Sequence, residues 1–232
     1  MSEWNFAKET TQEDEIDLFM GIISEYIESD EDRKKIKAVY KEHWPRISTM
    51  QASKSGKYHH WTEQTVHFGL LNHVIRGLYF ARELGIEEAG YESKKPEFQP
   101  KQQMRLVAMV VHDMGKMNAS GNNHGVYIHP ILKPHGFDSK VRMMAQNHMH
   151  KWSPYKAENK SQRIVAYADY LASRADIDVR GITYMMKVKG VLTAITHLSQ
   201  CQIPWVSNTP WRQITMDLTK PIADVDVNIQ GA

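Results

Sequence analysis

Five side chains of the kinds that bind transition metals lie in otherwise apolar stretches of this 232-residue chain. They are His73, the adjacent pair His112 and Asp113, His148, and Asp169. Each stretch has helical spacing, and helices bring such groups to one point when each contributes a polar residue from its inward face. Imidazole and carboxylate groups together suit divalent metals. The pattern predicts a metal centre, although a lone histidine on an apolar face is more often an ordinary core residue.

The composition narrows the chemistry. The single cysteine, Cys201, excludes an intramolecular disulfide and a thiolate cluster within the chain, so imidazole and carboxylate groups must hold any metal. The formal net charge of +2 is too small to favour a protein that coats nucleic acid. No stretch approaches the roughly 18 apolar residues of a membrane span. Since the N-terminus also lacks a secretory signal, we expect a cytoplasmic protein with no membrane partner.

Two amphipathic helices are expected in the N-terminal part of the chain. The first covers residues 11–28 and opens with Thr11 and Asp14, which resemble a capping pair. The second begins at Asp30, and Pro45 is expected to end it.

Further helices are expected to carry the candidate ligands. They cover residues 62–84, 103–115, 139–148 and 161–175. Gly85 would cap the first of these and Ser139 the third. Residues 118–136 are rich in Gly, Asn, Pro and His, which predicts a loop that carries ligands, with a short helix over residues 126–132. One more helix is expected over residues 182–198, and a period-two pattern after it predicts an extended tail.

The strings GLLNHVIRGLYFA, VAMVVHDMGK and QRIVAYADYLASR resemble the ligand-bearing helices of HD-domain metal-dependent phosphohydrolases. The resemblance covers residues 58–176 and implies an all-α HD-domain helical bundle. It also implies that His73, His112, Asp113 and Asp169 are metal ligands, with Asp113 able to bridge two ions. We therefore expect an N-terminal helical extension over residues 1–57, an HD core over 58–200, and a partly extended tail over 201–232. The tail could also pair with a second copy of the chain.

The form HDxGK implies a second metal in many members of this family. A histidine from the following loop and one or two from the next helix complete that site. The loop offers His124 and His129, and the sequence leaves the choice open; the helix offers His148, with or without His150. The expected cofactors are one or two divalent ions, drawn from Mn2+, Fe2+, Mg2+ and Ni2+.

The resemblance implies hydrolysis of a phosphate ester by a metal-activated water, with Asp113 and Lys116 as catalytic residues. The candidate substrate-binding residues are Lys116, Arg76, His150, Lys151 and Trp152. Each has a plainer interpretation, as a surface charge or as loop packing. YHHW at 58–61 followed by FGLLNH is similar to HD-type 3′-to-5′ exoribonucleases, but the spacing differs and His67 and Phe68 stand where that family has another glycine. A nucleotide or a single-stranded nucleic-acid 3′ end is therefore the favoured substrate.

Two other functional classes stay open on the sequence. HD proteins with two irons include oxygenases, and a histidine-rich site suits that chemistry as well. A non-catalytic HD module that binds a nucleotide is the third interpretation, although such a module would keep all of these ligands without using them. Dependence of turnover on dioxygen would separate the first two classes.

Overall fold

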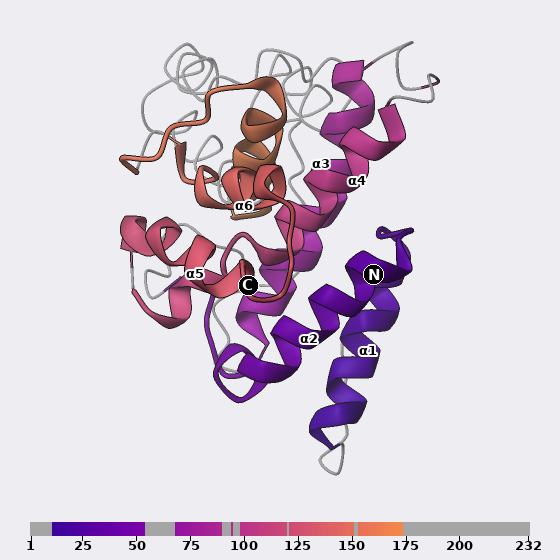
Figure 1. Cartoon of the computed structure of the whole chain (residues 1–232), viewed down its shortest axis with the longest axis vertical. Coiled ribbons are helices and arrows are strands. Elements are labelled where there is room, and N and C mark those ends of the chain that lie inside the picture. The colour runs from indigo at the N-terminus through magenta and orange to yellow at the C-terminus, as the bar shows by residue number, and fades with distance from the viewer. Residues whose placement is uncertain are drawn as a thin grey trace, which may run out of the picture. The chain divides into compact units, whose positions relative to one another are not determined.

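The structure is a computed structural model, and it describes residues 11–53, 68–89, 94, 98–119, 121–150 and 153–173. Its regular elements are helical, and the described residues contain no strand (Figure 1). The α-helices are α1 (Gln12–Ser24), α2 (Asp30–Ile47), α3 (Gly69–Ala89), α4 (Phe98–Val111), α5 (Ile128–Leu132), α6 (Ser139–Gln146) and a last helix over residues 160–173. Two 3-10 helices, η3 (Met114–Met117) and η4 (Gly121–Tyr127), follow α4. The predicted all-α fold is confirmed.

The chain divides into two compact units, Met1–Ser173 and Arg174–Ala232. All of the described residues belong to the first unit. The expected helix over residues 182–198 and the extended tail lie outside the described residues. The predicted division at residues 57 and 200 stays a prediction.

The α1–α2 hairpin packs around aromatic side chains, and a capping box marks the start of α1. Thr11 caps α1, and the predicted capping box is confirmed: Thr11 Oγ1 accepts from the Asp14 amide at 3.2 Å, and Asp14 Oδ2 accepts from the Thr11 amide at 2.9 Å. Phe19 packs on Tyr40 and Trp44 of α2, with ring centroids 4.7 Å and 6.1 Å away. Burying each ring stabilises the fold by roughly 2–3 kcal/mol.

The prediction that Pro45 ends the second helix is wrong, because α2 continues to Ile47. A proline costs a helix one amide donor, but this proline lies in the last turn, where only one bond is lost. The amide of Ser48 donates to the Trp44 carbonyl at 2.9 Å and closes that turn. The buried side chains of Trp44 and Ile47 anchor the same turn in the core.

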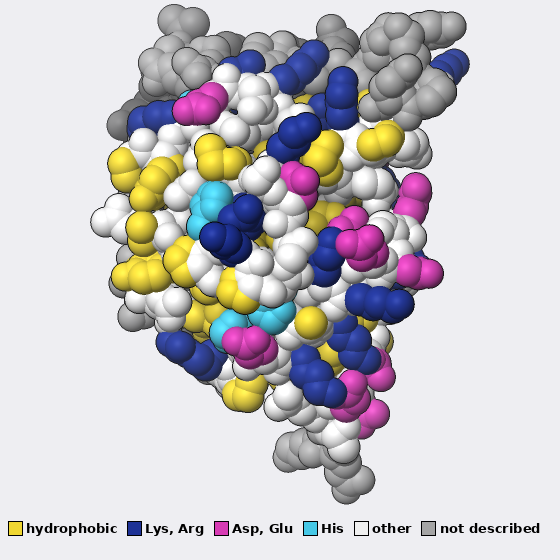
Figure 2. All heavy atoms as spheres, viewed as in Figure 1, with side chains coloured by type: hydrophobic (Ala, Val, Ile, Leu, Met, Phe, Trp, Pro, Cys, Tyr) yellow, Lys and Arg dark blue, Asp and Glu magenta, His cyan; other side chains and the backbone are white. Residues whose placement is uncertain are grey.

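Opposite charges alternate on the outer face of the hairpin. Lys37 pairs with Glu13 and Asp17 at 3.1 Å and 2.6 Å, and Lys41 pairs with Glu13 at 2.7 Å. Figure 2 shows acidic and basic side chains interleaved over α1 and α2. Exposed pairs of this kind contribute about 0–1 kcal/mol each. On this face the positive charges do not form the separate basic surface that a nucleic-acid backbone would favour.

α3 begins later and ends later than its periodicity predicts. Phe68 has a φ of 60°, which interrupts any helix from Thr62, so α3 begins at Gly69. At the other end Gly85 lies inside the helix, and its predicted capping role is wrong. A Cβ on Gly85 would lie 2.0 Å from Gln102 Oε1, so this glycine allows α4 to pack closely on α3.

A short stretch between the hairpin and the bundle lies against the start of α3. We call residues 48–53 the brace segment. The amides of Phe68 and Leu70 donate to the carbonyls of Ser48 and Met50, each at 2.8 Å. His73 lies three residues after Leu70 in the same helix, so the brace segment holds the start of the helix that carries this residue.

α6 begins at Ser139, the residue that the sequence predicts as its cap, and ends at Gln146, two residues before His148. Asp138, rather than Ser139, caps it, and Asp138 Oδ1 accepts from the Lys140 amide at 2.6 Å. α6 ends at Gln146, so His148 lies in the turn that follows. α4 packs on both α3 and α6 and forms the centre of the bundle. In the described part of the chain, no helix has the length and apolar character needed to cross a bilayer.

Candidate metal centre

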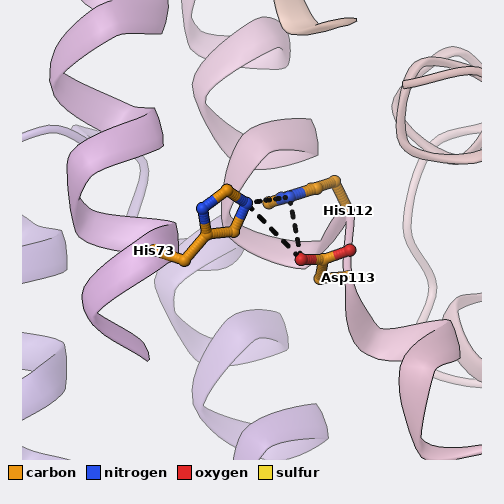
Figure 3. Close-up of side chains that lie close together, drawn as sticks. All are labelled: His73, His112 and Asp113. Atoms are coloured by element: carbon orange, nitrogen blue, oxygen red, sulfur yellow. Dashed lines mark hydrogen bonds and ion pairs between the residues drawn. The ribbon is translucent and has the colours of Figure 1, made fainter. Parts of the chain in front are cut away.

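Three of the predicted ligands meet between α3 and the end of α4. His73 points from α3 toward His112 and Asp113 (Figure 3). The two Nε2 atoms lie 3.3 Å apart, and Asp113 Oδ2 lies 3.2 Å from His112 Nε2 and 3.6 Å from His73 Nε2. All three residues are at most 2% exposed. Their donor atoms are close enough to bind one ion together.

Asp169 joins this group from the helix over residues 160–173. Its Oδ1 lies 2.8 Å from His73 Nε2 and 3.6 Å from His112 Nε2. The side chain is 14% exposed, whereas those of His73 and His112 are fully buried. We call His73, His112, Asp113 and Asp169 the first group.

A second group forms on the other oxygen of Asp113. Asp113 Oδ1 lies 3.0 Å from His124 Nε2 and 3.5 Å from His148 Nε2, and the two imidazole nitrogens lie 2.9 Å apart. His124 comes from η4 and His148 from the turn after α6. Both are about 1% exposed. The Asp113 carboxylate therefore lies between two sets of potential metal ligands.

The local backbone structure explains how His124 comes to lie next to Asp113. α4 ends at Val111, and Asp113 has φ −98° and ψ 4°, so the chain leaves helical geometry there. Two residues later, a Cβ on Gly115 would lie 2.0 Å from the His124 carbonyl oxygen. Only glycine permits so close an approach of the backbone of η4. The glycine of HDxGK thus brings the loop histidine next to Asp113.

Hydrogen bonds to backbone carbonyls fix the orientation of two rings. His112 Nδ1 lies 2.6 Å from the Met109 carbonyl oxygen, and His148 Nδ1 lies 2.6 Å from the Ala145 carbonyl oxygen. A carbonyl only accepts, so Nδ1 must carry the proton, and Nε2 of the neutral ring then presents a lone pair to the centre. Burial lowers the pKa of His148 from 6.5 to about 4, so this ring is neutral at physiological pH.

The carboxylates stay ionised although they are buried. Burial opposes ionisation of Asp113, but His112 and Lys116 outweigh it and hold its pKa well below the ordinary value. For Asp169, burial is likewise outweighed by its interactions with His112 and His73, and its pKa is also well below the ordinary value. Burial lowers the pKa of His112, yet the two carboxylates raise it overall. The centre therefore attracts positive charge.

These features fit one or two divalent cations. The buried Asp113 Oδ1 accepts no hydrogen bond from the described residues, and it faces two imidazole nitrogens. An ionised carboxylate in such a place costs several kcal/mol unless positive charge compensates it. Imidazole nitrogens that lie about 3 Å from one another and from carboxylate oxygens are suited to a shared cation.

The structure places the two loop histidines in different surroundings. His124 lies in the second group, whereas the His129 ring lies elsewhere, with Nδ1 3.1 Å from a guanidinium nitrogen of Arg142. Burial and the Arg142 charge lower the pKa of His129. Nothing in the described residues brings it to either group.

The predicted substrate-binding residues that the structure describes differ in their contacts. Lys116 Nζ donates to Asp113 Oδ2 at 2.6 Å and to the Ala52 carbonyl at 2.7 Å. Arg76 Nε donates to the Ala172 carbonyl at 3.1 Å, which ties α3 to the last helix. His150 has a φ of 38°, and its Nδ1 accepts from the Ala157 amide at 3.1 Å. Lys151 and Trp152 lie outside the described residues.

Sequence analysis did not anticipate two contacts around the centre. Tyr40, part of the apolar stripe of α2, donates its hydroxyl to the Val110 carbonyl at 2.7 Å and so supports the last turn before His112. The Ala52 carbonyl, which accepts from Lys116, belongs to the brace segment, for which the sequence analysis predicted no contact. Every residue has a backbone carbonyl, so no residue pattern in the sequence could have indicated this second contact.

The comparison with protein families gives one match. The family model of the HD domain matches residues 70–174, a range that contains every member of both groups. No match was found among the curated proteins or among the solved structures.

Proposed function

Because residues 70–174 belong to the HD-domain superfamily, we propose that this chain is a metal-dependent phosphohydrolase that hydrolyses a nucleotide or a nucleic-acid 3′ end. The observation that carries the proposal is the Asp113 carboxylate, whose two oxygens face two different sets of imidazole nitrogens. A carboxylate shared in this way suits two ions that act on one phosphoryl group.

The residues divide into two sites. His73, His112, Asp113 and Asp169 would hold one divalent ion, and Asp113, His124 and His148 would hold the other. When bound, such ions lower the pKa of a water molecule toward neutrality and stabilise charge on the phosphoryl oxygens. Four imidazoles and no thiolate favour Fe2+, Mn2+ or Ni2+ over Mg2+, which prefers oxygen ligands.

The chain supplies orientation and exclusion of water. Carbonyls of Met109 and Ala145 fix the rings of His112 and His148, so their Nε2 atoms point to the centre without further rearrangement. The second group is almost fully buried, whereas Asp169 retains 14% exposure and Lys116 17%. A phosphate ester would therefore approach past Asp169 and Lys116.

The substrate class is the least supported part of the proposal. It rests on the resemblance described above and on Trp152 and Lys151, which could stack on a base and pair with a phosphate. Trp152 and Lys151 lie outside the described residues. Phosphodiesterase and nucleotidase activity differ in product, so a screen of both nucleotides and short oligonucleotides is needed.

The two loop histidines provide a matched test. His124→Ala should lose one metal and most turnover, because it removes a ligand of the second site. His129→Ala should keep metal content and turnover, because that side chain contacts Arg142 instead. Elemental analysis of protein purified without chelator or affinity metal gives the stoichiometry. Release of phosphate or nucleotide with added Mn2+, Mg2+, Ni2+ or Fe2+ gives the activity.

The outcomes separate the competing interpretations. Turnover that persists without dioxygen supports hydrolysis, and turnover that stops under argon would favour a di-iron oxygenase. Equal effects of His124→Ala and His129→Ala would contradict the assignment of the second site. Wild-type protein that binds no divalent metal would refute the proposal and leave the non-catalytic module.

A further inference from the structure

Lys116 is held from two sides by strong acceptors. Its Nζ lies 2.6 Å from Asp113 Oδ2 and 2.7 Å from the carbonyl oxygen of Ala52. Ala52 belongs to the brace segment and is itself buried, at 3% exposure. Lys116 thus links the candidate metal centre to a part of the chain that lies before α3.

The oxygen that Lys116 contacts is the one that the first group would use. Asp113 Oδ2 lies within 3.6 Å of both His73 Nε2 and His112 Nε2. A divalent ion held by these three atoms would lie within a few Å of the Lys116 ammonium. Like charges at such a distance repel strongly where the surroundings exclude water. The ammonium and the ion therefore cannot both keep their best position on this oxygen.

From this geometry we infer that Lys116 is an internal counter-ion that competes with a divalent cation for Asp113 Oδ2. Loading of the first group moves the ammonium away from Asp113 and weakens its bond to Ala52, so the brace segment senses metal loading. The inference rests on the proposed function in taking the first group to be a metal site. Lys116 is then a positioning residue in the metal-free protein.

The other attachments of the brace segment limit the expected change. Phe68 and Leu70 bind the carbonyls of Ser48 and Met50 through their amides. These bonds do not involve Lys116. Loss of the bond between Lys116 and Ala52 should therefore loosen the end of the brace segment without unfolding α3.

The same geometry bears on the predicted role of Lys116 with substrate. Its ammonium has three donors, and Asp113 and Ala52 occupy two of them. The Lys116 side chain is already 17% exposed while it is bound to Asp113, and an ammonium released from that contact is better able to meet a phosphate. Metal loading would then prepare Lys116 for substrate, and the order of binding would be metal first.

The test uses Mn2+ titration of the full-length, chelator-treated protein by calorimetry. Lys116→Met should bind Mn2+ about tenfold more tightly than wild type, because the competing charge is gone. Lys116→Arg keeps the charge and should stay close to wild type. Lys133→Met removes one exposed positive charge and should also stay close, which controls for net charge. Unchanged or weaker binding by folded Lys116→Met would overturn the inference.

Hydrogen exchange provides a readout that does not depend on the affinity of a variant. In the wild-type protein, Mn2+ should speed exchange of amides in the brace segment severalfold while it slows exchange in α4. In Lys116→Met that segment should exchange fast with or without metal. A brace segment that does not respond to Mn2+ in wild type would overturn the coupling. Absence of Mn2+ binding in every protein would instead refute the proposed metal centre, and the inference with it.

Discussion

The α1–α2 hairpin and the metal centre are equally buried but are built on opposite principles. In the hairpin, apolar rings pack together and each buried polar tip has a partner: the Tyr40 hydroxyl binds the Val110 carbonyl, and Trp44 Nε1 donates to Glu15 at 2.8 Å. In the centre, ionised carboxylates and imidazole rings face one another, and Asp113 Oδ1 accepts no hydrogen bond from the described residues. The buried polar groups of the hairpin have partners within the chain, whereas the candidate centre holds a buried carboxylate oxygen that a cation would satisfy.

This contrast separates stability from function along the chain. The hairpin gains free energy from packing that any apolar core supplies. In the candidate centre, burial of charge costs free energy, and a bound metal would offset that cost. Substitutions in the two regions should therefore have opposite effects on metal content and on stability without metal.

The largest effect is expected from Asp113→Asn. This change removes the charge that both groups share, so metal affinity should fall by more than about 100-fold and turnover should disappear. Without metal, the unfolding free energy should change by less than about 1 kcal/mol, because Lys116 reaches solvent once it is released. Elemental analysis and denaturant titration of chelator-treated protein test the two halves. Strong destabilisation of the metal-free variant would show that the centre is a structural element like the hairpin.

Phe19→Ala should give the converse result. Truncation of a ring that packs on Tyr40 and Trp44 should destabilise the protein by about 3–5 kcal/mol. The folded fraction should keep its metal stoichiometry. Leu18, the neighbouring residue, is 48% exposed, so Leu18→Ala is a matched control that should cost less than about 0.5 kcal/mol. Loss of metal from folded Phe19→Ala would show that the two regions are coupled.

An intermediate effect is expected from pH. The His148 pKa is about 4 in the fold and near 6.5 when the chain is unfolded, so the unfolded state binds protons more tightly. Metal-free protein should therefore lose stability through His148 as pH falls from about 6.5 to 4, by roughly 3 kcal/mol in all. The raised pKa of His112 acts in the opposite direction. The difference in unfolding free energy between wild type and His148→Gln, measured across this pH range, isolates the contribution of His148. Parallel stability curves for the two proteins would contradict the prediction.

The sequence predicted the parts of the fold that follow from local patterns. Apolar spacing placed α1, α2 and α4 with small errors at their ends, and the HDxGK string placed His112 and Asp113 together. The errors at Pro45 and Gly85 have one cause, since local rules treat both residues as helix breakers while tertiary packing keeps both in helices. The Gln102 side chain packs against Gly85 where a Cβ would lie, and no local pattern carries that information.

The candidate site shows the same limit. Ligand types and their helices could be read from the chain, but the choice between His124 and His129 depends on how the loop folds back over Gly115. Spatial approach alone distinguishes them, so the sequence left the choice open.

The smallest effect is expected on the outer face of the hairpin. Lys37 pairs with Glu13 and Asp17, but these side chains are 38–60% exposed, so solvent screens their attraction. Lys37→Ala should therefore cost at most about 1 kcal/mol, less in high salt, and should leave metal affinity unchanged. Denaturant titrations at low and high salt measure the difference. A cost of several kcal/mol would mean that charge, and not only packing, stabilises the hairpin. The hairpin and the candidate centre would then both depend on charge. They would differ in where the compensating charge comes from, since the hairpin takes it from its own side chains and the centre would take it from a bound cation.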